Sequence, residues 1–204
     1  MKILCVARNY GLHAAEMKSA VPTEPVFFMK PDSAILHDGQ PFFYPEFSKD
    51  VHHELELVVR IDKVGKSIEP QFASRYYSSV TVGIDFTARD IQAGLKENRY
   101  PWLIAKGFDG SAVLGDFVPL SDLGKGIQDL DIQLLKNGEE VQHGNTSQMI
   151  FSVDQLISYI SKFMLLRTGD LIYTGTPVGV GPVQIGDTLE GFLEGRKLMD
   201  CRVK

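Results

Sequence analysis

The sequence is poor in cysteine, has no cluster of basic residues and contains no long hydrophobic run. Its two cysteines, Cys5 and Cys201, lie near opposite ends of the 204 residues, so neither a disulfide framework nor a cysteine metal site is indicated. The net charge is −5 and the lysines and arginines are scattered, which argues against nucleic acid or an anionic membrane as a partner. No apolar run approaches the roughly 20 residues of a membrane-spanning helix. A reducing cytoplasm is therefore the expected location.

The composition suits one folded domain. Hydrophobic residues make up 44% of the chain and charged residues 23%, which allows a sizeable core. No linker, low-complexity stretch or change of composition divides the sequence, so we expect a single domain over residues 1–204. The apolar segment 2–7 is too short for a signal peptide and lacks a small-residue cleavage site, so it predicts a buried first strand.

Strand-like segments outnumber helical ones. Strands are expected at residues 2–7, 25–29, 54–62, 79–85, 112–118, 130–136, 170–174, 187–193 and 197–203. The Asn137-Gly138 pair between apolar runs predicts a hairpin. Helices are expected at residues 10–18, with Asn9 as N-cap, at 69–78, at 87–98, and after Ser152, which begins a capping box. Because the strands do not alternate with helices, we expect an α+β fold built as a mixed β-roll and not a doubly wound parallel sheet.

Residues 51–59 carry the clearest chemical signal. Apolar and polar side chains alternate, as in a strand with one face in a core, so Glu54 and Glu56 project side by side. Two carboxylates that close repel each other, and a divalent cation removes the repulsion. All-oxygen ligands favour Mg²⁺, Mn²⁺ or Ca²⁺ over Zn²⁺, and Leu57 stands where the zinc motif H-E-x-x-H needs a histidine. Taken alone, such a pair more often marks the solvated face of an edge strand.

Asp85 offers a third ligand, because it ends the apolar segment 79–85, where an acid can line a cleft. Turn formation or capping of the following helix explains Asp85 at least as well when it is taken alone. The two histidines beside the acids are given no part in the metal site. His53 shares the apolar face with Leu55 and is interpreted as structural, whereas His52 shares the face of the acids and is left out of the site.

Three further segments can contribute to a site. His13 and Glu16 lie three residues apart on the expected helix 10–18, where a carboxylate can orient an imidazole as general base, although such a pair is common on helix surfaces. Lys106 closes an apolar run before a glycine, where it can present a cation to an anionic substrate or extend from a strand end into solvent. The loop 173–182 can offer backbone N–H groups to a carboxylate, but it lacks the pattern of a P-loop or a dinucleotide site.

Seven ordered segments resemble motifs of the fumarylacetoacetate hydrolase (FAH) superfamily. They span nearly the whole chain and are Cys5–Tyr10 with His13 and Glu16, Phe28–Pro31, His53–Glu56, Ile84–Asp90, Lys106–Asp109, Met149–Phe151 and Thr174–Gly181. Arg8 and the run Thr87–Gln92 are most similar to the acylpyruvase and oxaloacetate decarboxylase branch. Gly107 departs from the family, because relatives commonly have serine after the lysine, and this leaves contacts of the distal pocket open.

The resemblance implies an FAH fold, a mixed β-roll similar to a β-sandwich with few short helices. It also implies a homodimer and a catalytic Mg²⁺ or Mn²⁺. The residues that match the family's functional positions are Glu54, Glu56 and Asp85 as metal ligands, His13, Glu16 and Lys106 as catalytic residues, and Arg8, Gln92 and Thr176 as substrate-binding residues. The histidine and glutamate of the catalytic set would lie on a short helix that acts as a lid.

The activity implied by the resemblance is hydrolysis of a C–C bond in 3-acylpyruvates, which are 2,4-dioxo acids, to pyruvate and a carboxylic acid. Oxaloacetate decarboxylation is a related reaction, because it needs the same enolate. One alternative is the isomerisation or hydration of hydroxy-dienoates from aromatic degradation, which moves protons without breaking a C–C bond. Another is a non-catalytic module that binds 2-oxo acids. A small 2-oxo acid is the expected partner in each case.

Overall fold

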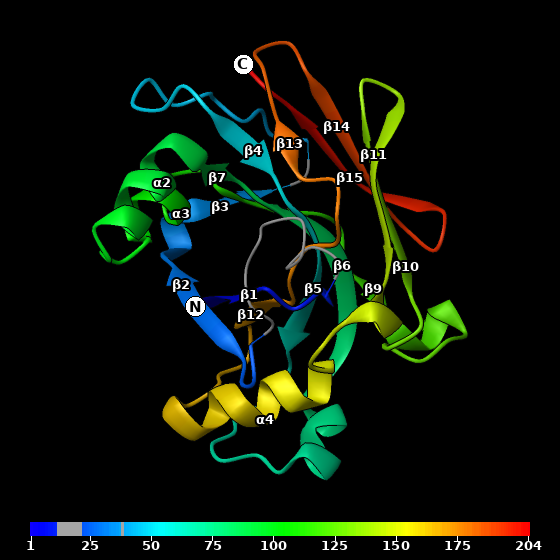
Figure 1. The fold of residues 1–204 in the computed structure, drawn as a ribbon. Helices are drawn as coiled ribbons and strands as arrows, with labels where there is room; N and C mark the ends of the chain where they lie inside the picture. The colour runs from blue at the N-terminus through cyan, green and yellow to red at the C-terminus, as the bar shows by residue number, and fades with distance from the viewer. Residues whose placement is uncertain (12–21, 38) are drawn as a thin grey trace.

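Short apolar and β-branched segments fold into a structure dominated by strands (Figure 1). The computed structural model describes residues 1–11, 22–37 and 39–204. Its largest sheet contains, in spatial order, β2 (Val26–Lys30), β1 (Ile3–Ala7), β12 (Leu171–Tyr173), β5 (Leu55–Ile61), β6 (Tyr77–Asp85), β8 (Ala112–Leu114) and β3 (Ile35–His37), with β9 (Val118–Pro119) paired to β6. The pairs β1–β12 and β3–β8 are parallel and the others are antiparallel, so the sheet is mixed.

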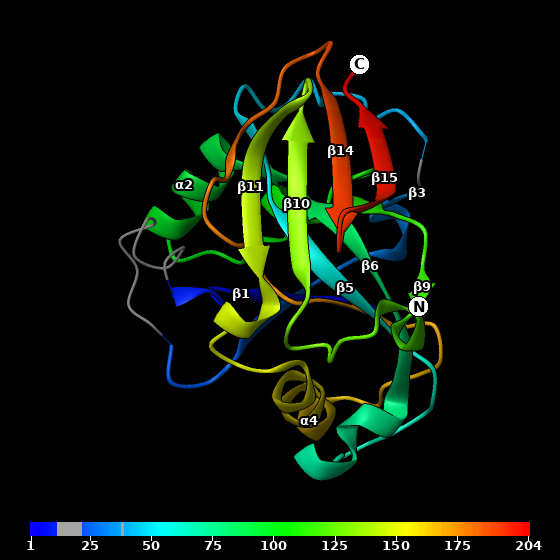
Figure 2. The same cartoon turned by 90° about the vertical axis from the view of Figure 1, so that its right-hand side faces the viewer.

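A second, antiparallel sheet packs across one face of the first. It contains β11 (Glu139–Asn145), β10 (Asp131–Lys136), β14 (Thr188–Leu193) and β15 (Arg196–Arg202), and Figure 2 shows these strands in front of β5 and β6. Leu57 of β5 shares one apolar core with Leu134 and Leu189 of the second sheet. Asn137 and Gly138 form the turn between β10 and β11 with φ of 55° and 84°, which confirms the predicted hairpin.

The remaining elements are short. A three-stranded sheet contains β13 (Gly181–Pro182), β4 (Val51–His53) and β7 (Thr87–Ala88). Among the described residues the α-helices are α2 (Arg89–Glu97), α3 (Leu103–Lys106) and α4 (Val153–Phe163), and 3-10 turns cover Asp32–Ala34, Pro70–Tyr76, Leu120–Leu123 and Thr146–Gln148. Ser152 and Gln155 form the predicted capping box at the start of α4. Within the described ranges, no helix combines the length and the apolar character needed to cross a bilayer.

The mixed, strand-rich architecture agrees with the predicted fold class, while several local predictions need correction. The expected strand 112–118 is divided into β8 and β9, and the helix expected at 69–78 is a 3-10 turn. The helix expected at 87–98 begins only at Arg89, because Thr87 and Ala88 pair with β4. Most of the helix expected at 10–18 lies outside the described residues.

The prediction that residues 51–59 form one strand with a single buried face is wrong in two respects. The strand breaks at Glu54, so β4 and β5 belong to different sheets. β5 is also buried on both faces, with Leu55 and Leu57 in the main core and Val58 in a second apolar cluster behind the large sheet. Glu56 therefore points into the protein and not to solvent, with 1% of its surface exposed.

Asn9 joins the end of β1 to two loops. Its side chain accepts a hydrogen bond from the N–H of Phe151 at 2.8 Å and donates to the carbonyls of Phe151 at 3.0 Å and Thr174 at 2.8 Å. The side chain is fully buried, so each of these bonds replaces one to water. The N-cap role expected for Asn9 concerns a helix that lies largely outside the described residues.

Asn9→Asp tests this connection. The substitution keeps the acceptor but places carboxylate oxygens against two buried carbonyls, so we expect the free energy of unfolding to fall by about 2 kcal/mol or more. Urea unfolding at pH 7, followed by circular dichroism, measures the loss. The matched control is Asn98→Asp, because the exposed Asn98 side chain donates to the carbonyl of Gly94 in its own helix turn. Its loss should stay below about 1 kcal/mol, and equal losses would contradict the assignment.

Candidate metal centre and active-site cleft

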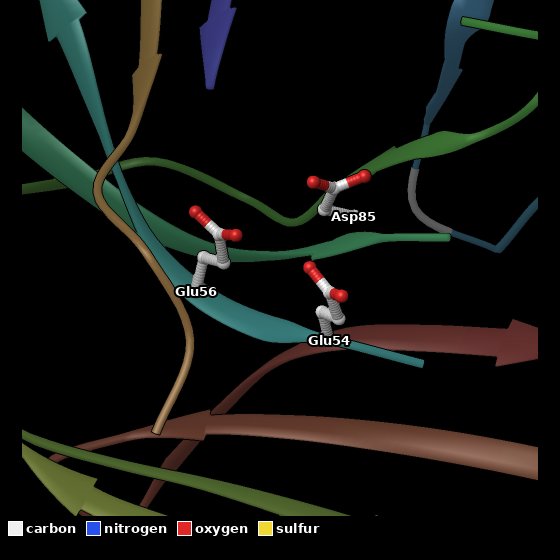
Figure 3. A group of neighbouring side chains, drawn as sticks. All are labelled: Glu54, Glu56 and Asp85. Carbon is white, nitrogen blue, oxygen red and sulfur yellow. The ribbon is translucent and has the colours of Figure 1, made fainter. Parts of the chain in front are cut away.

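Three buried carboxylates converge where β4, β5 and β6 meet (Figure 3). Glu56 lies in β5 opposite Gly83 of β6, and Asp85 ends β6 beside Glu54. The Asp85 N–H donates to the Glu54 carbonyl at 2.9 Å, which fixes these two residues side by side. One oxygen of each carboxylate lies within 4.8 Å of the others. The antiparallel register of β5 and β6 therefore assembles the three acids that the sequence singled out.

Cationic side chains from three other elements contact these acids. The Lys106 ammonium lies 2.8 Å from a carboxylate oxygen of Glu54 and 2.8 Å from one of Asp85. The Lys30 ammonium lies 2.7 Å from the other oxygen of Asp85 and also donates to two backbone carbonyls. Arg89 forms an ion pair with the second oxygen of Glu54. Charges at this depth are stable only when they are paired, so the cations make the acid cluster possible.

Glu56 is held by the backbone of the glycine-rich loop. Its carboxylate accepts a hydrogen bond from the N–H of Gly175 at 2.6 Å. Burial, reinforced by the neighbouring Asp85 and Glu54, holds the pKa of Glu56 well above its ordinary value. For Lys106, burial favours the neutral amine, but the attraction of Asp85 and Glu54 outweighs it and raises the pKa. The pocket therefore favours additional positive charge next to Glu56.

The donor set fits a hard divalent cation. Glu54, Glu56 and Asp85 together offer carboxylate oxygens and no nitrogen or sulfur, which suits Mg²⁺ or Mn²⁺ better than Zn²⁺. A cation between them would also relieve the repulsion that raises the pKa of Glu56. These three residues are the ones that would hold the metal.

A cleft opens beside the acids. Its walls include the three acids, Arg89 and Lys106, together with Arg8, Phe28, Gln92, Lys96, Trp102 and Thr176. Arg8 follows β1 with φ of 60°, a left-handed conformation that is rare for a residue other than glycine and that often marks functional sites. Arg89 donates to the Gln92 side-chain oxygen at 3.0 Å and so orients this amide. The cations on the walls suit an anionic ligand.

Seven of the nine predicted site residues meet in this cleft. They are Glu54, Glu56, Asp85, Lys106, Arg8, Gln92 and Thr176. His13 and Glu16 lie outside the described residues. Lys106 ends helix α3 and is 3% exposed, so the interpretation of this residue as a strand-end lysine that reaches solvent is wrong.

The two histidines beside the acids do not join the donor set. His53 is buried, and its Nδ1 lies 2.9 Å from the side-chain oxygen of Gln142, which agrees with its predicted structural role. Burial lowers the pKa of His53 to about 4. The Nε2 of His52 lies 2.9 Å from Asp50. Gly107, where the family resemblance leads one to expect serine, lies outside the cleft. A Cβ at this position would lie 2.8 Å from the Leu103 side chain, so glycine here affects packing around α3 and not the lining of the cleft.

Lys30, Arg89 and Lys96 are cleft or cluster residues to which sequence reasoning assigned no role. Lys30 and Arg89 fall inside segments that resemble the family, so the resemblance was the one available signal. Lys30 looks locally like a lysine at the exposed end of a strand, but it pairs with Asp85 and donates to the carbonyls of Phe86 and Ser111, which the fold brings to it from other segments. Lys96 looks like an ordinary basic residue in the last turn of α2.

Comparisons with known proteins identify the family of this chain. The family model described as fumarylacetoacetate (FAA) hydrolase C-terminal matches residues 2–204. A bovine (Bos taurus) protein named mitochondrial oxaloacetate tautomerase FAHD1 is 42% identical over 202 residues, which are 99% of this chain and 91% of the relative. A Dictyostelium discoideum protein named mitochondrial oxaloacetate decarboxylase is 43% identical over 195 residues, 95% of this chain and 89% of the relative.

A solved structure is similar over the whole chain. It is the fumarylpyruvate hydrolase of Pseudomonas aeruginosa in complex with Mn²⁺ and pyruvate, and it matches with a TM-score of 0.93 at 38% identity over 100% of this chain and 89% of that one. Fold, sequence motifs and family model thus agree along nearly the full length. This chain belongs to the fumarylacetoacetate hydrolase family.

Proposed function

We propose that this protein is a metal-dependent enzyme that interconverts the keto and enol forms of oxaloacetate and decarboxylates it. The observation that carries the proposal is the buried triad of Glu54, Glu56 and Asp85 in a cleft with cationic walls. The names of the full-length relatives, an oxaloacetate tautomerase and an oxaloacetate decarboxylase, support this substrate. We therefore propose oxaloacetate as the main substrate, ahead of the 3-acylpyruvates that the sequence resemblance suggested.

Charge balance favours a substrate with two negative charges. Three carboxylates and the cations Lys30, Lys106 and Arg89 nearly cancel one another in the described cluster. A divalent cation held by ionised carboxylates leaves about two positive charges in excess. Arg8 and Lys96 add to this positive field along the cleft. Oxaloacetate, with its two carboxylates, supplies the opposite charge.

The chain's own residues bind and orient the substrate. When bound, Mg²⁺ or Mn²⁺ supplies Lewis-acid stabilisation of the enolate. Lys106 places an ammonium beside Glu54 and Asp85 in the cleft, where it stabilises negative charge that develops on the substrate oxygen. Phe28 and Trp102, whose rings meet edge to face, add apolar wall that limits the access of water.

Proton transfer needs a base, and we propose His13 oriented by Glu16. This assignment rests on the family resemblance, because both residues lie outside the described part of the chain. In tautomerisation the base removes a proton from C3 and the C2 oxygen receives one. In decarboxylation the C3–C4 bond breaks, CO₂ leaves and C3 is protonated to give pyruvate.

Hydrolysis of 3-acylpyruvates is the second candidate activity. The structural match to a fumarylpyruvate hydrolase favours it. Here His13 would remove a proton from water, which adds to the C4 carbonyl. The C3–C4 bond then breaks, giving a carboxylic acid and the enolate of pyruvate, which is protonated at C3. The homodimer and the cytoplasmic location stay predictions from the sequence.

A substrate panel tests the proposed activity. With Mg²⁺ or Mn²⁺, the protein should accelerate the change in enol absorbance of oxaloacetate and release pyruvate, and a chelator should abolish both. Acetylpyruvate and a 2-hydroxy-diene-dioate are assayed beside it. Faster turnover of the diene-dioate would favour the isomerase alternative, and binding of pyruvate without turnover of any substrate would favour the non-catalytic module. Either result would contradict the proposal.

Glu56→Gln tests the metal ligands. The amide keeps an acceptor for Gly175 but removes a charge, so the affinity for Mn²⁺ in calorimetry should fall at least about tenfold. In chelator, however, the variant should be more stable than wild type at pH 7. Because the pKa of Glu56 is raised in the folded state, metal-free wild type loses stability as the pH rises above the ordinary glutamate pKa, and the difference should vanish near pH 4.

The matched control for this change is Glu139→Gln in β11, because Glu139 is exposed and lies outside the cleft. It should leave both the Mn²⁺ affinity and the pH dependence of unfolding unchanged. Wild-type Mn²⁺ affinity in Glu56→Gln would remove this residue from the ligand set.

Lys96→Met tests recognition of the second carboxylate. Partial desolvation of its ammonium and the neighbouring Arg89 and Arg8 lower the pKa of Lys96, which lines the cleft. The variant should raise KM for oxaloacetate about tenfold, equivalent to about 1.4 kcal/mol, and change KM for the monocarboxylate acetylpyruvate less than about twofold. Lys49→Met, an exposed change outside the cleft, is the control. An equal rise in KM for both substrates would show that Lys96 does not bind the second carboxylate.

A further inference from the structure

The glycine-rich loop 174–181 lies directly against β11. A Cβ at Gly179, which has φ of 95°, would lie 2.2 Å from the carbonyl oxygen of Val141, and a Cβ at Gly144 would lie 2.6 Å from the Cβ of Pro177. Glycine at these positions permits an approach that any side chain would block. The loop therefore packs directly against the backbone of β11.

A bulge in β11 turns one polar side chain toward this loop. Leu134 of β10 pairs with Gln142, but the next residue of β10 pairs with Glu140, so Val141 is the extra residue. Gln142 consequently points inward and is 1% exposed. An amide at this depth must satisfy its donors and acceptor within the protein.

All the strong hydrogen-bonding positions of Gln142 are occupied. Its side-chain oxygen lies 2.9 Å from both the N–H of Leu55 and Nδ1 of His53. Its NH₂ group donates to the Thr176 hydroxyl at 2.9 Å and to the Pro177 carbonyl at 3.1 Å. A backbone N–H can only donate, so Leu55 fixes which end of the amide carries the oxygen. The NH₂ end must then face Thr176.

This polarity determines what the Thr176 hydroxyl can do. Its oxygen accepts from Gln142, so its own proton is directed elsewhere. Within the part of the chain that the structure describes, its other hydrogen-bond contact, with the Pro177 carbonyl, is long at 3.4 Å. Thr176 lines the cleft beside the acids. A hydroxyl that already accepts one hydrogen bond is also a better donor for the next. Its proton is thus available to an anionic oxygen in the cleft.

We infer that Gln142 is a positioning residue that makes the Thr176 hydroxyl a hydrogen-bond donor to the carboxylate of the substrate. The inference rests on the proposed function, which places a 2-oxo acid in this cleft. Gln142 does not touch the substrate. It acts through Thr176, and it links that residue to β5 because the same amide holds the N–H of Leu55, next to Glu54.

A double-mutant cycle on pyruvate binding tests this inference. The variants are Gln142→Glu, Thr176→Val and the double substitution, each loaded with Mn²⁺ and titrated with pyruvate in a calorimeter. Gln142→Glu keeps the acceptor for Leu55 and removes the N–H that faces Thr176. We expect it to weaken pyruvate binding about tenfold in the wild-type background and less than about twofold in the Thr176→Val background. Gln142→Met provides a second way to remove the donor, and Gln184→Glu, an exposed change, is the control.

Equal weakening by Gln142→Glu in both backgrounds would overturn the inference, because the residue would then act on the loop and not through Thr176. Melting temperatures that fall without a change in pyruvate affinity would overturn it too, as they would show a purely structural role. Unchanged affinity in Thr176→Val would do the same, even if oxaloacetate turnover is intact. Conversely, coupled pyruvate binding without turnover of oxaloacetate would support the role of Gln142 and reject the proposed activity.

Discussion

The burial of three carboxylates in one small volume is the constraint on which the rest of this structure depends. Glu54, Glu56 and Asp85 would repel one another and lose their hydration if nothing compensated them. Lys30 arrives from β2, Lys106 from α3 and Arg89 from α2. The edge strand β2 of the large sheet and the helices α2 and α3 are therefore tied to the same cluster. The apolar core on the other face of β5 stabilises the sheet that carries the three acids.

The alternation of apolar and polar residues was sufficient to predict which side chains of a segment share a face. The alternation in 51–59 placed Glu54 and Glu56 on one face and His53 on the other, and both placements agree with the structure. It could not show that β5 is buried on both sides, because that depends on which strands flank it and what packs behind them. Nor could it pair β5 with β6, and this pairing brings Asp85 to the two glutamates.

Lys30 and Gln142 show where local patterns fail in physical terms. A lysine that ends an apolar strand is usually exposed, whereas Lys30 is buried because the fold brings Asp85 and two backbone carbonyls to it from distant segments. Gln142 points inward because a bulge at Val141 shifts the register of β11 by one residue. Both effects arise from non-local pairing, which leaves no mark in a short window of sequence.

The glycine-rich loop connects the acid cluster to the wall of the cleft at Thr176. Gly175 donates to Glu56, and the next residue, Thr176, lines the cleft and is oriented by Gln142. Binding a cation requires Glu56 to be ionised, and an ionised carboxylate accepts the Gly175 N–H more strongly than a protonated one. A cation held by Glu56 would therefore favour the loop conformation that presents Thr176. By thermodynamic reciprocity, a substrate carboxylate held by Thr176 would in turn strengthen the binding of that cation.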